Sequence, residues 1–218
     1  MKKRNSIIKI AIDSPAAAGA GTLAKALSKH YNLFYLDTGK IYRFVGNLKI
    51  KFPKKFNYKF IKSKIKSLKM KDLSNKNLLS DKVATVASII AKDKKIRKIV
   101  HAFQLKCAYN PAKRYAGSCL DGRDIGRVVV KNADFKFYVT ADVKTIALRR
   151  YKQLKSLKKK ITYSDVLKSI KKRDKSDKSR KISPLKKTKD SILINTSKLD
   201  RRLQFLKVKK IIDRKLNN

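Results

Sequence analysis

The strongest constraint on the fold is a short apolar segment that leads through a run of small residues into a helical pattern. Residues 7–13 (IIKIAID) are mostly apolar and rich in β-branched side chains, which is typical of a buried strand. After the small residues SPAAAGAGT, apolar side chains in 23–31 recur every three or four positions, as on one helix face. A strand, a tight loop and a helix in this order predict an α/β unit.

The rest of the chain repeats this alternation. Four more strand-like segments occur at 33–37, 117–121, 135–140 and 192–195, and helical faces separate several of them. Strands that alternate with helices favour a parallel sheet, here of five strands flanked by helices. Two connections are long: 38–111, which reads as helical, and 149–187, which is very basic. Long excursions of this kind commonly carry substrate contacts.

Length and composition indicate one folded domain. The chain has 218 residues, 42% of them hydrophobic, which excludes a wholly disordered basic tail. No apolar run approaches the roughly 18 residues of a membrane span, and the first residues meet an acid and a proline too early for a signal peptide. We expect a cytoplasmic protein.

Cys107 and Cys119 lack the spacing of a metal site or a disulfide framework and are expected to be buried thiols. His30 and His101 are expected to be packed or surface residues rather than ligands.

The charge is extreme but does not decide the function. Lys and Arg number 59 against 15 acidic residues, giving a net charge of +44, and every acid is Asp. Any carboxylate role therefore falls to Asp. The lysines are spread along the chain, with nine in 49–70, a segment that could form a helix face or a patch. Three interpretations stay open: a solvated surface, an anionic small substrate, or a polyanionic partner such as nucleic acid.

The small-residue loop has the composition of a phosphate-binding loop. Small side chains let successive backbone N–H groups converge on an anion at a helix N-terminus. The standard pattern is GxxxxGK[ST], and here Ser14 takes the place of the first glycine and Ala20 that of the lysine. Taken alone, the loop is equally compatible with an ordinary tight turn.

Three further motifs change this assessment: LDTGKIYR at 36–43, LDGRDIGRVV at 120–129 and IKKRDKSDKSR at 170–180. LDGRDIGRVV is the most specific of the three, because an Asp, two Arg and two Gly at a strand end have no role in core packing. The alternative interpretation of this motif is a structural ion pair of Arg123 with Asp124. Together with IAIDSPAAAGAGTLAK, these blocks resemble, in order and spacing, the bacterial cytidylate kinase family of nucleoside monophosphate kinases. The resemblance covers nearly the whole chain.

The resemblance implies an architecture and a reaction. It implies a P-loop NTPase-type core (1–37, 112–148 and 188–218), a monophosphate-binding insertion (38–111) and a lid (149–187). It implies transfer of the ATP γ-phosphate to CMP or dCMP with Mg²⁺, giving CDP or dCDP. We expect a monomer that binds no membrane, and nucleic acid only non-specifically through its basic surface.

The resemblance also implies roles for individual residues. It assigns the donor phosphates to the loop and places Thr22 near the metal. The loop residues are Ser14, Pro15, Ala16, Ala17, Ala18, Gly19, Ala20, Gly21 and Thr22. The catalytic cations are Arg123, Arg150, Arg173 and Arg180. Arg149 is a further arginine of the lid. The acceptor site comprises Thr38, Arg43, Ser88, Arg97, Asp121, Gly122, Arg123, Asp124, Arg173, Asp177 and Arg180.

Base choice has a chemical rationale within this set. Asp124 can accept from the N4 amino group of cytosine but would face the O4 acceptor of uracil. Arg97 can donate to the acceptors O2 and N3, and the Ser88 hydroxyl would complete the contacts. For Arg97 a solvated helix charge is the other interpretation. Asp177, with Arg173, is expected at the sugar.

Two departures from the family qualify these expectations. Ala20 replaces the loop lysine, a loss of about 3–4 kcal/mol in transition-state stabilisation; Lys25 or Lys40 could compensate. The segment between Arg43 and Val83 is short and lysine-rich, which puts acceptor specificity in doubt. The alternative function is a catalytically impaired relative that binds nucleic acid or another polyanion, and a kinase for a different monophosphate is a third reading.

Overall fold

The computed structural model describes residues 7–156 and 160–217. The strands are β1 (Ile8–Asp13), β2 (Leu33–Asp37), β3 (Gly117–Gly122), β4 (Phe135–Thr140) and β5 (Ile192–Asn195). The α-helices are α1 (Ala20–His30), α2 (Thr38–Lys51), α3 (Tyr58–Lys66), α4 (Asp81–Ile90), α5 (Lys94–Tyr109), α6 (Val143–Ser156), α7 (Tyr163–Ser179) and α8 (Arg201–Asn217). Short 3₁₀ turns occupy Pro53–Lys55, Met70–Ser74 and Lys76–Leu79, and a π-helix occupies Ile125–Val129.

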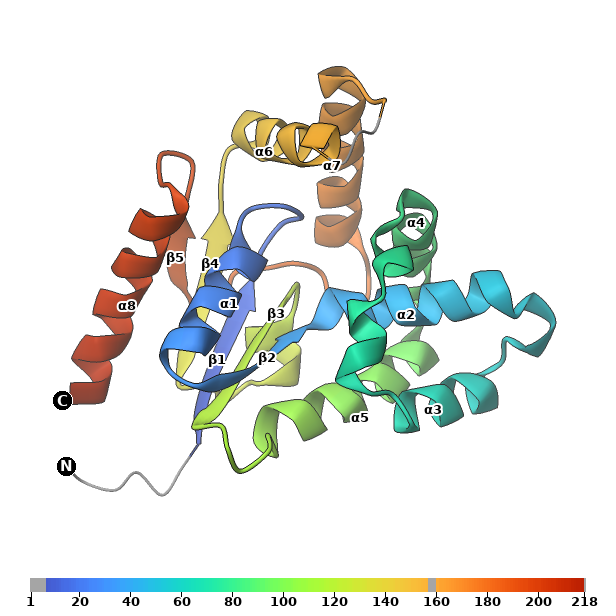
Figure 1. The fold of residues 1–218 in the computed structure, drawn as a ribbon, viewed down its shortest axis with the longest axis horizontal. Coiled ribbons are helices and arrows are strands. Elements are labelled where there is room, and N and C mark those ends of the chain that lie inside the picture. Colours follow the sequence, from blue (N-terminus) through green and yellow to red (C-terminus); the bar gives the residue numbers. More distant parts are fainter. Residues whose placement is uncertain (1–6, 157–159, 218) are drawn as a thin grey trace.

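The strands form one five-stranded sheet in the order β2-β3-β1-β4-β5, and every neighbouring pair is parallel. This confirms the predicted fold class and all five predicted strands, with boundaries that differ by no more than a residue. All carboxyl ends of the strands therefore meet at one edge of the sheet. In Figure 1 that edge faces upward, toward the pair of helices α6 and α7.

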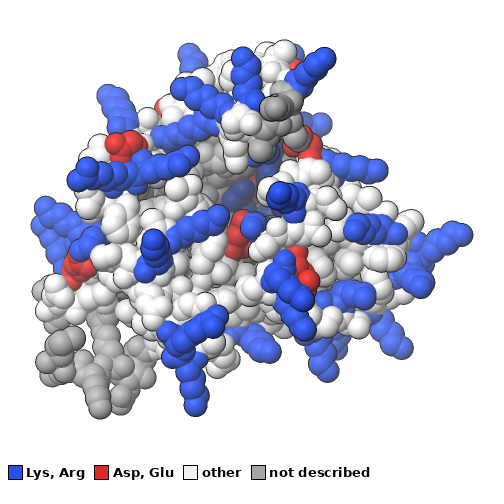
Figure 2. Space-filling view, in the orientation of Figure 1, with Lys and Arg blue, Asp and Glu red and all other residues white. Residues whose placement is uncertain are grey.

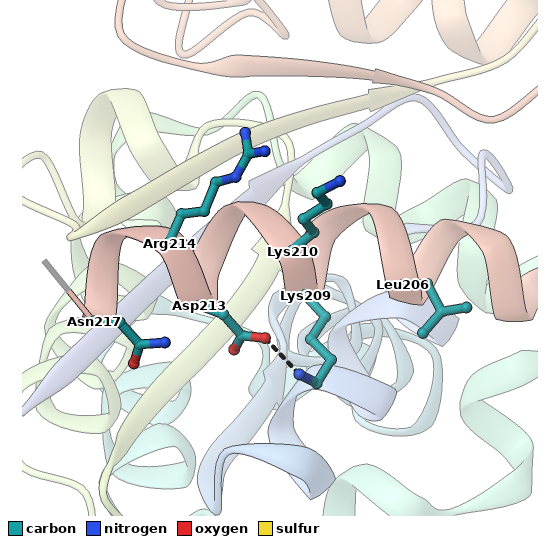
Figure 3. A pocket seen from close by; sticks show the side chains of 6 residues that line it. All are labelled: Leu206, Lys209, Lys210, Asp213, Arg214 and Asn217. Carbon is teal, nitrogen blue, oxygen red and sulfur yellow. Dashed lines mark hydrogen bonds and ion pairs between the residues drawn. The ribbon is translucent and has the colours of Figure 1, made fainter.

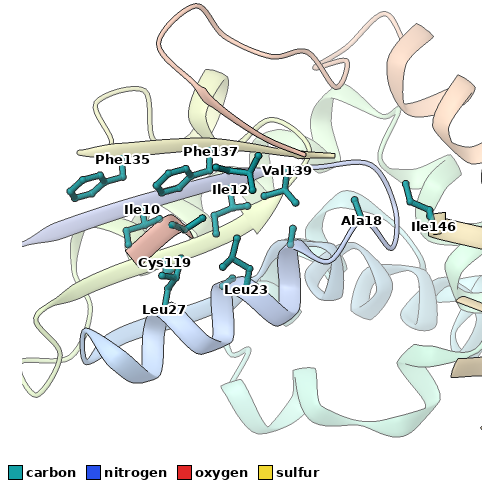
Figure 4. Packing of buried hydrophobic residues seen from close by; sticks show 14 of the residues in the cluster. Ile10, Ile12, Ala18, Leu23, Leu27, Cys119, Phe135, Phe137, Val139 and Ile146 are labelled. Atoms are coloured by element: carbon teal, nitrogen blue, oxygen red, sulfur yellow. The ribbon is translucent and has the colours of Figure 1, made fainter. Parts of the chain in front are cut away.

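Alternation along β1 divides the core between the two faces of the sheet. Ile10 and Ile12 point to one cluster, which α1 and α8 close with residues such as Leu27 and Val208. Ala11 belongs to the opposite cluster, with residues of α2 and α5. Figure 4 shows the first cluster between α1 and the sheet. Burial on both faces explains why the strand reads as a continuous apolar run.

The predicted insertion is helical throughout its described length, with no strand between residues 38 and 109. Side-chain oxygens cap its helices: Asp37 for α2, Asn57 for α3, Ser80 for α4 and Asp93 for α5. These helices lie to the right of the sheet in Figure 1, whereas α6 and α7 lie above it. The long connections thus flank the carboxyl edge from two sides.

Two smaller findings concern the rest of the sequence predictions. Cys119 is buried, as expected, but Cys107 is only half-buried, so the prediction of two buried thiols is wrong for Cys107; burial raises the pKa of both thiols. Both are free. Among the described residues, no helix is both long and apolar enough to cross a membrane.

Gly117 tests the close pairing of β3 with β1. A Cβ atom there would lie 1.9 Å from the backbone oxygen of Ile8, so the two strands would have to separate. We expect Gly117→Ala to lower the free energy of unfolding by about 3 kcal/mol, measured by denaturant titration. Gly21→Ala is the control, because its Cβ would meet only ordinary contacts at 3.5 and 3.6 Å. Equal loss in both variants would contradict the strand-clash explanation.

Candidate functional site

The predicted site residues gather where the carboxyl edge of the sheet meets the flanking helices. Figure 2 shows the surface hollowed beneath α6 and α7, with basic side chains and an acidic one in the hollow. The loop after β1, the turn after β3 and the N-terminus of α2 reach this edge from the sheet side. Ligands of open parallel sheets bind at this edge, outside the carboxyl ends of the strands.

A buried carboxylate at the end of β1 holds the turn after β3. Asp13 is 4% exposed and accepts hydrogen bonds from the amides of Ile125 (2.6 Å) and Gly126 (2.9 Å). Burial raises the pKa of Asp13 to about 6, against the opposing effect of these two bonds. Asp13 thus fixes the LDGRDIG segment relative to the phosphate-loop sequence. Our sequence analysis missed it, although an acid that ends a buried strand was a usable signal.

The phosphate-loop sequence has the backbone geometry of an anion-binding turn. Gly19 caps α1 in the left-handed region (φ 98°), and Ala17 also has a positive φ of 61°. The Ala16 amide faces the carboxylate of Asp174 on α7 and lowers the pKa of that group, against the stronger effect of burial. The loop therefore combines two positive-φ positions with an amide that faces a carboxylate.

The loop is supported from behind by the segment after β5. Thr196 is fully buried, and its hydroxyl lies 3.1 Å from the carbonyl oxygens of both Ala18 and Thr140. The amide group of Gln204 packs against Gly19, where a Cβ atom would lie 3.2 Å from its oxygen. These contacts hold the loop in place without any ligand.

Arg149, from the segment predicted to be the lid, completes this support. Its guanidinium donates to the hydroxyl (3.1 Å) and carbonyl (2.7 Å) of Thr196 and to the carbonyl of Leu199 (3.2 Å). In this structure it anchors α6 to the segment after β5. Its neighbour Arg150 instead donates to Gln153 and lies 3.8 Å from Asp81.

Asp121 forms an acidic pocket beside the loop. Burial and the charge of Asp37 raise its pKa to about 7, although Tyr35, Arg123 and Lys25 act in the opposite direction. The Tyr35 hydroxyl and Asp121 Oδ2 lie close together beside Gly21. Asp121 Oδ1 is buried and has no hydrogen-bond partner among the described residues. A carboxylate oxygen without a donor is suited to a hard cation.

Four arginines from four segments, α2, the turn after β3, α6 and α7, converge on the same edge. Burial together with the charges of Arg123, Arg43 and Arg150 lowers the pKa of Arg173 to about 10, whereas Asp177 opposes them. Burial and the charges of Arg150 and Arg123 likewise lower the pKa of Arg43. Half-buried guanidinium groups that repel one another form a site for a multiply charged anion, because planar guanidinium forks suit phosphate.

Arg97 and Asp124 form a buried ion pair between α5 and the turn after β3. Arg97 is 9% exposed, donates to the Ala91 carbonyl (3.2 Å) and lies 5.5 Å from the centre of the Tyr42 ring. The interpretation of Arg97 as a solvated helix charge is therefore wrong. So is the ion pair of Arg123 with Asp124, since Arg123 binds Asp177 at 2.9 Å instead.

The remaining predicted acceptor residues lie around this pair. Thr38 donates to the Asp121 carbonyl (2.8 Å) and leaves no room for a side chain at Gly122. Arg43 donates to the Leu78 carbonyl (2.8 Å), and Ser88 donates to Thr85 within α4. Arg180 donates to the Ser183 carbonyl (2.6 Å) and lies 3.8 Å from Asp177. In this structure Asp177 thus pairs with Arg123 and Arg180.

A second surface depression lies elsewhere, along α8 (Figure 3). An ion pair of Lys209 with Asp213 crosses it, and the Tyr31 hydroxyl donates to Asp213 at 2.7 Å. These contacts attach α8 to the end of α1. His30 packs edge-on against Tyr31 and Phe205 in the same region, as expected for a packed residue. The depression contains none of the predicted motif residues.

Asp121 makes stability depend on pH. Its pKa rises from 3.8 to about 7 on folding, so the folded protein keeps a proton that the unfolded chain loses, and stability falls as pH rises through this window. We expect Asp121→Asn to raise the melting temperature at pH 8, with a gain that shrinks toward pH 4.5, measured by thermal unfolding. Asp190→Asn should give no gain, because Lys136 lowers the pKa of that exposed carboxylate. An Asp121→Asn gain that grows at low pH would contradict this explanation.

Comparison with known proteins agrees with this geometry. A cytidylate kinase family model matches residues 10–213. Cytidylate kinases from Methylocella silvestris and Bartonella tribocorum are 38% and 40% identical over 192 and 193 residues, 88% and 87% of this chain and 87% of each relative. The fold also resembles a crystal structure of an uncharacterized protein from Eubacterium ventriosum (TM-score 0.56, 19% identity, 94% of this chain and 98% of that one). The chain belongs to the cytidylate kinase family.

Proposed function

We propose that this protein transfers the γ-phosphate of ATP to CMP or dCMP, giving CDP or dCDP. The observation that carries the proposal is the convergence of Arg43, Arg123, Arg150 and Arg173 on the edge of the sheet beside a phosphate loop. The family membership of the chain supports the same reaction. The alternative, an impaired relative that binds nucleic acid, is not favoured, because it would not need a buried Arg97–Asp124 pair at the acceptor side.

The reaction needs alignment and charge neutralisation more than a general base. An acceptor phosphate has a second pKa of about 6 and is ionised at neutral pH, so its oxygen can attack directly. We propose that the loop from Ser14 to Thr22 holds the donor phosphates through its backbone amides from Ala16 to Thr22. We also propose that Arg123, Arg150, Arg173 and Arg180 neutralise the charge that spreads over the transferring group. The absence of Glu from the chain is then no handicap.

The residues at the acidic pocket fit a magnesium ion. Mg²⁺ is usually held by one or two carboxylates together with phosphate oxygens and waters, so it needs no larger cluster of ligands. The described part of the chain contains no cluster of three or more His, Cys or acidic side chains that could hold a metal ion. Asp121, with its unpartnered Oδ1, and Asp37 offer such carboxylates, and the Thr22 hydroxyl is the predicted third ligand. Bound there, the ion would neutralise phosphate charge.

We propose that the Arg97–Asp124 pair reads the cytosine edge. The pair is preformed and presents a donor and an acceptor, so the base meets groups that Tyr42 and the Ala91 carbonyl already hold. Asp124 can accept from the N4 amino group, whereas uracil would bring its O4 against the carboxylate. Thr38 and Arg43 would bind the monophosphate, and Ser88 would contact the base.

The wider description also belongs to this proposal. We propose that 38–111 is the monophosphate-binding insertion and 149–187 the lid, although α6 begins at Val143, ahead of that boundary. The contact of Asp177 with the sugar would require its bonds to Arg123 and Arg180 to rearrange. A monomeric state, a cytoplasmic location and non-specific binding of nucleic acid remain predictions.

Substrate choice tests the function directly. We expect the purified protein with ATP and Mg²⁺ to release ADP faster with CMP or dCMP than with UMP or AMP, measured in a coupled assay. Equal rates with all four acceptors would contradict cytosine recognition, and no ADP release with any of them would contradict the kinase reaction.

Asp124 tests base recognition within that assay. We expect Asp124→Asn to lower kcat/KM for CMP by about 100-fold, because the carboxylate is lost and Arg97 stays buried without its charge partner. The ratio of CMP to UMP turnover is the decisive quantity, since it does not depend on the fraction of folded enzyme. Lys29→Ala, at an exposed position of α1, is the control for handling and assay. An unchanged ratio would remove Asp124 from the base site.

A further inference from the structure

Position 20 is the one place where the loop departs in charge from the phosphate-binding pattern. Ala20 is 3% exposed and belongs to the hydrophobic cluster behind the loop, with Ala18 and Leu23. A charged side chain would have to leave this packing to reach an anion in front of the loop. If the site uses a lysine, its charge must come from another position.

Lys25 lies on the same helix and is directed toward the site. Residues four apart share one face of a helix, so Lys25 lies one turn beyond Gly21. Side chains on a helix lean toward its N-terminus, which directs Lys25 back over Gly21 toward the phosphate loop. Gly21 leaves that path open, because it has no side chain. A Cβ atom there would lie 3.5 Å from the Tyr35 hydroxyl and 3.6 Å from Asp121 Oδ2.

The surroundings of the Lys25 ammonium group link it to the acidic pocket. Its Nζ lies 6.0 Å from the centre of the Tyr35 ring, and the hydroxyl of that ring lies beside Asp121 Oδ2 near Gly21. The charge of Lys25 also lowers the pKa of Asp121, although burial and Asp37 act more strongly in the opposite direction. The ammonium group is therefore close to the edge where the loop, β2 and β3 meet.

Lys25 is also uncommitted, unlike most of the arginines around it. Arg97 is bound to Asp124, Arg123 to Asp177 and Arg149 to Thr196. Lys25 is exposed, and within the described part of the chain it takes part in no hydrogen bond or ion pair. A long, flexible side chain without a carboxylate partner can turn toward an incoming phosphate without breaking a bond.

We propose that Lys25 supplies, from the second turn of α1, the positive charge that the pattern GxxxxGK[ST] places at position 20. This proposal rests on the proposed function, because it assigns Lys25 to the donor phosphates of the same reaction. It selects Lys25 over Lys40 because the charge of Lys25 acts on Asp121, whereas the contact of Lys40 in the described residues is the hydrogen bond of its backbone amide to Asp37 at the start of α2.

The experiment compares Lys25→Ala, Lys25→Arg, Lys40→Ala and Lys29→Ala. Lys29 is the matched control, because it is an exposed lysine one turn farther along α1. We expect Lys25→Ala to lower kcat for CMP phosphorylation by about 100-fold, with the KM for CMP and the melting temperature unchanged. Lys25→Arg should recover a large part of this loss, since it restores the charge. Lys29→Ala and Lys40→Ala should stay within about threefold of the unchanged protein.

Binding of MgATP, measured by calorimetry on the same variants, separates this proposal from the proposed function. If the unchanged protein does not phosphorylate CMP, the kinase proposal fails. In that case, weaker MgATP binding in Lys25→Ala alone would still support the role of Lys25 at the donor phosphates. Equal MgATP binding in all variants would overturn that role. If the unchanged protein is active, an equal kcat in Lys25→Ala would overturn the proposal. So would a loss in Lys40→Ala alone, or a lower melting temperature that accounts for the loss in Lys25→Ala.

Discussion

The site depends on the buried Asp13 carboxylate and the two amides that it accepts from. The bonds to Ile125 and Gly126 join the end of β1, where the phosphate loop begins, to the turn that carries Arg123 and Asp124. They add to the parallel pairing of β1 with β3, in which Asp13 lies opposite Gly122, and they fix the turn that follows β3. Burial raises the pKa of Asp13, and the hydrogen bonds from the two backbone amides offset part of this effect.

The geometry that favours a phosphorylated ligand also works against the ligand-free protein. The charges of Arg123, Arg43 and Arg150 lower the pKa of Arg173, and the charge of Asp37 raises the pKa of Asp121. Phosphates beside the arginines and a cation beside the carboxylates would offset both repulsions. Repulsion of this kind in the ligand-free protein is the expected compromise between stability and function at a preorganised site.

The surface charge of the whole chain has a different character from the charge in the site. Figure 2 shows lysines and arginines distributed over the visible face rather than gathered in one region. Most of the arginines in the site are buried or held by specific partners, whereas the surface lysines are solvated. The net charge of +44 thus says little about the reaction, although it would steer an anionic nucleotide toward the protein at low ionic strength.

The sequence determined the order of elements, the five strands and the motifs at their ends. Buried parallel strands are short apolar runs closed by turns, and this local signal placed the segments 33–37, 135–140 and 192–195 at their observed bounds. The carboxyl-edge location of the site followed from the motifs that end these strands. Family resemblance then supplied the expected roles, and family membership is confirmed.

Only the tertiary structure decided which charges meet. Arg97 pairs with Asp124, 27 residues away, and Arg123 with Asp177, 54 residues away, although a neighbouring partner was available to Arg123 in the sequence. Arg149, an arginine of the predicted lid, binds the buried Thr196 behind the loop. Charge pairing depends on distance and burial after the helices have packed, and a linear pattern contains neither. The sequence therefore fixes which groups reach the edge of the sheet, and packing decides which of them stay free for a ligand.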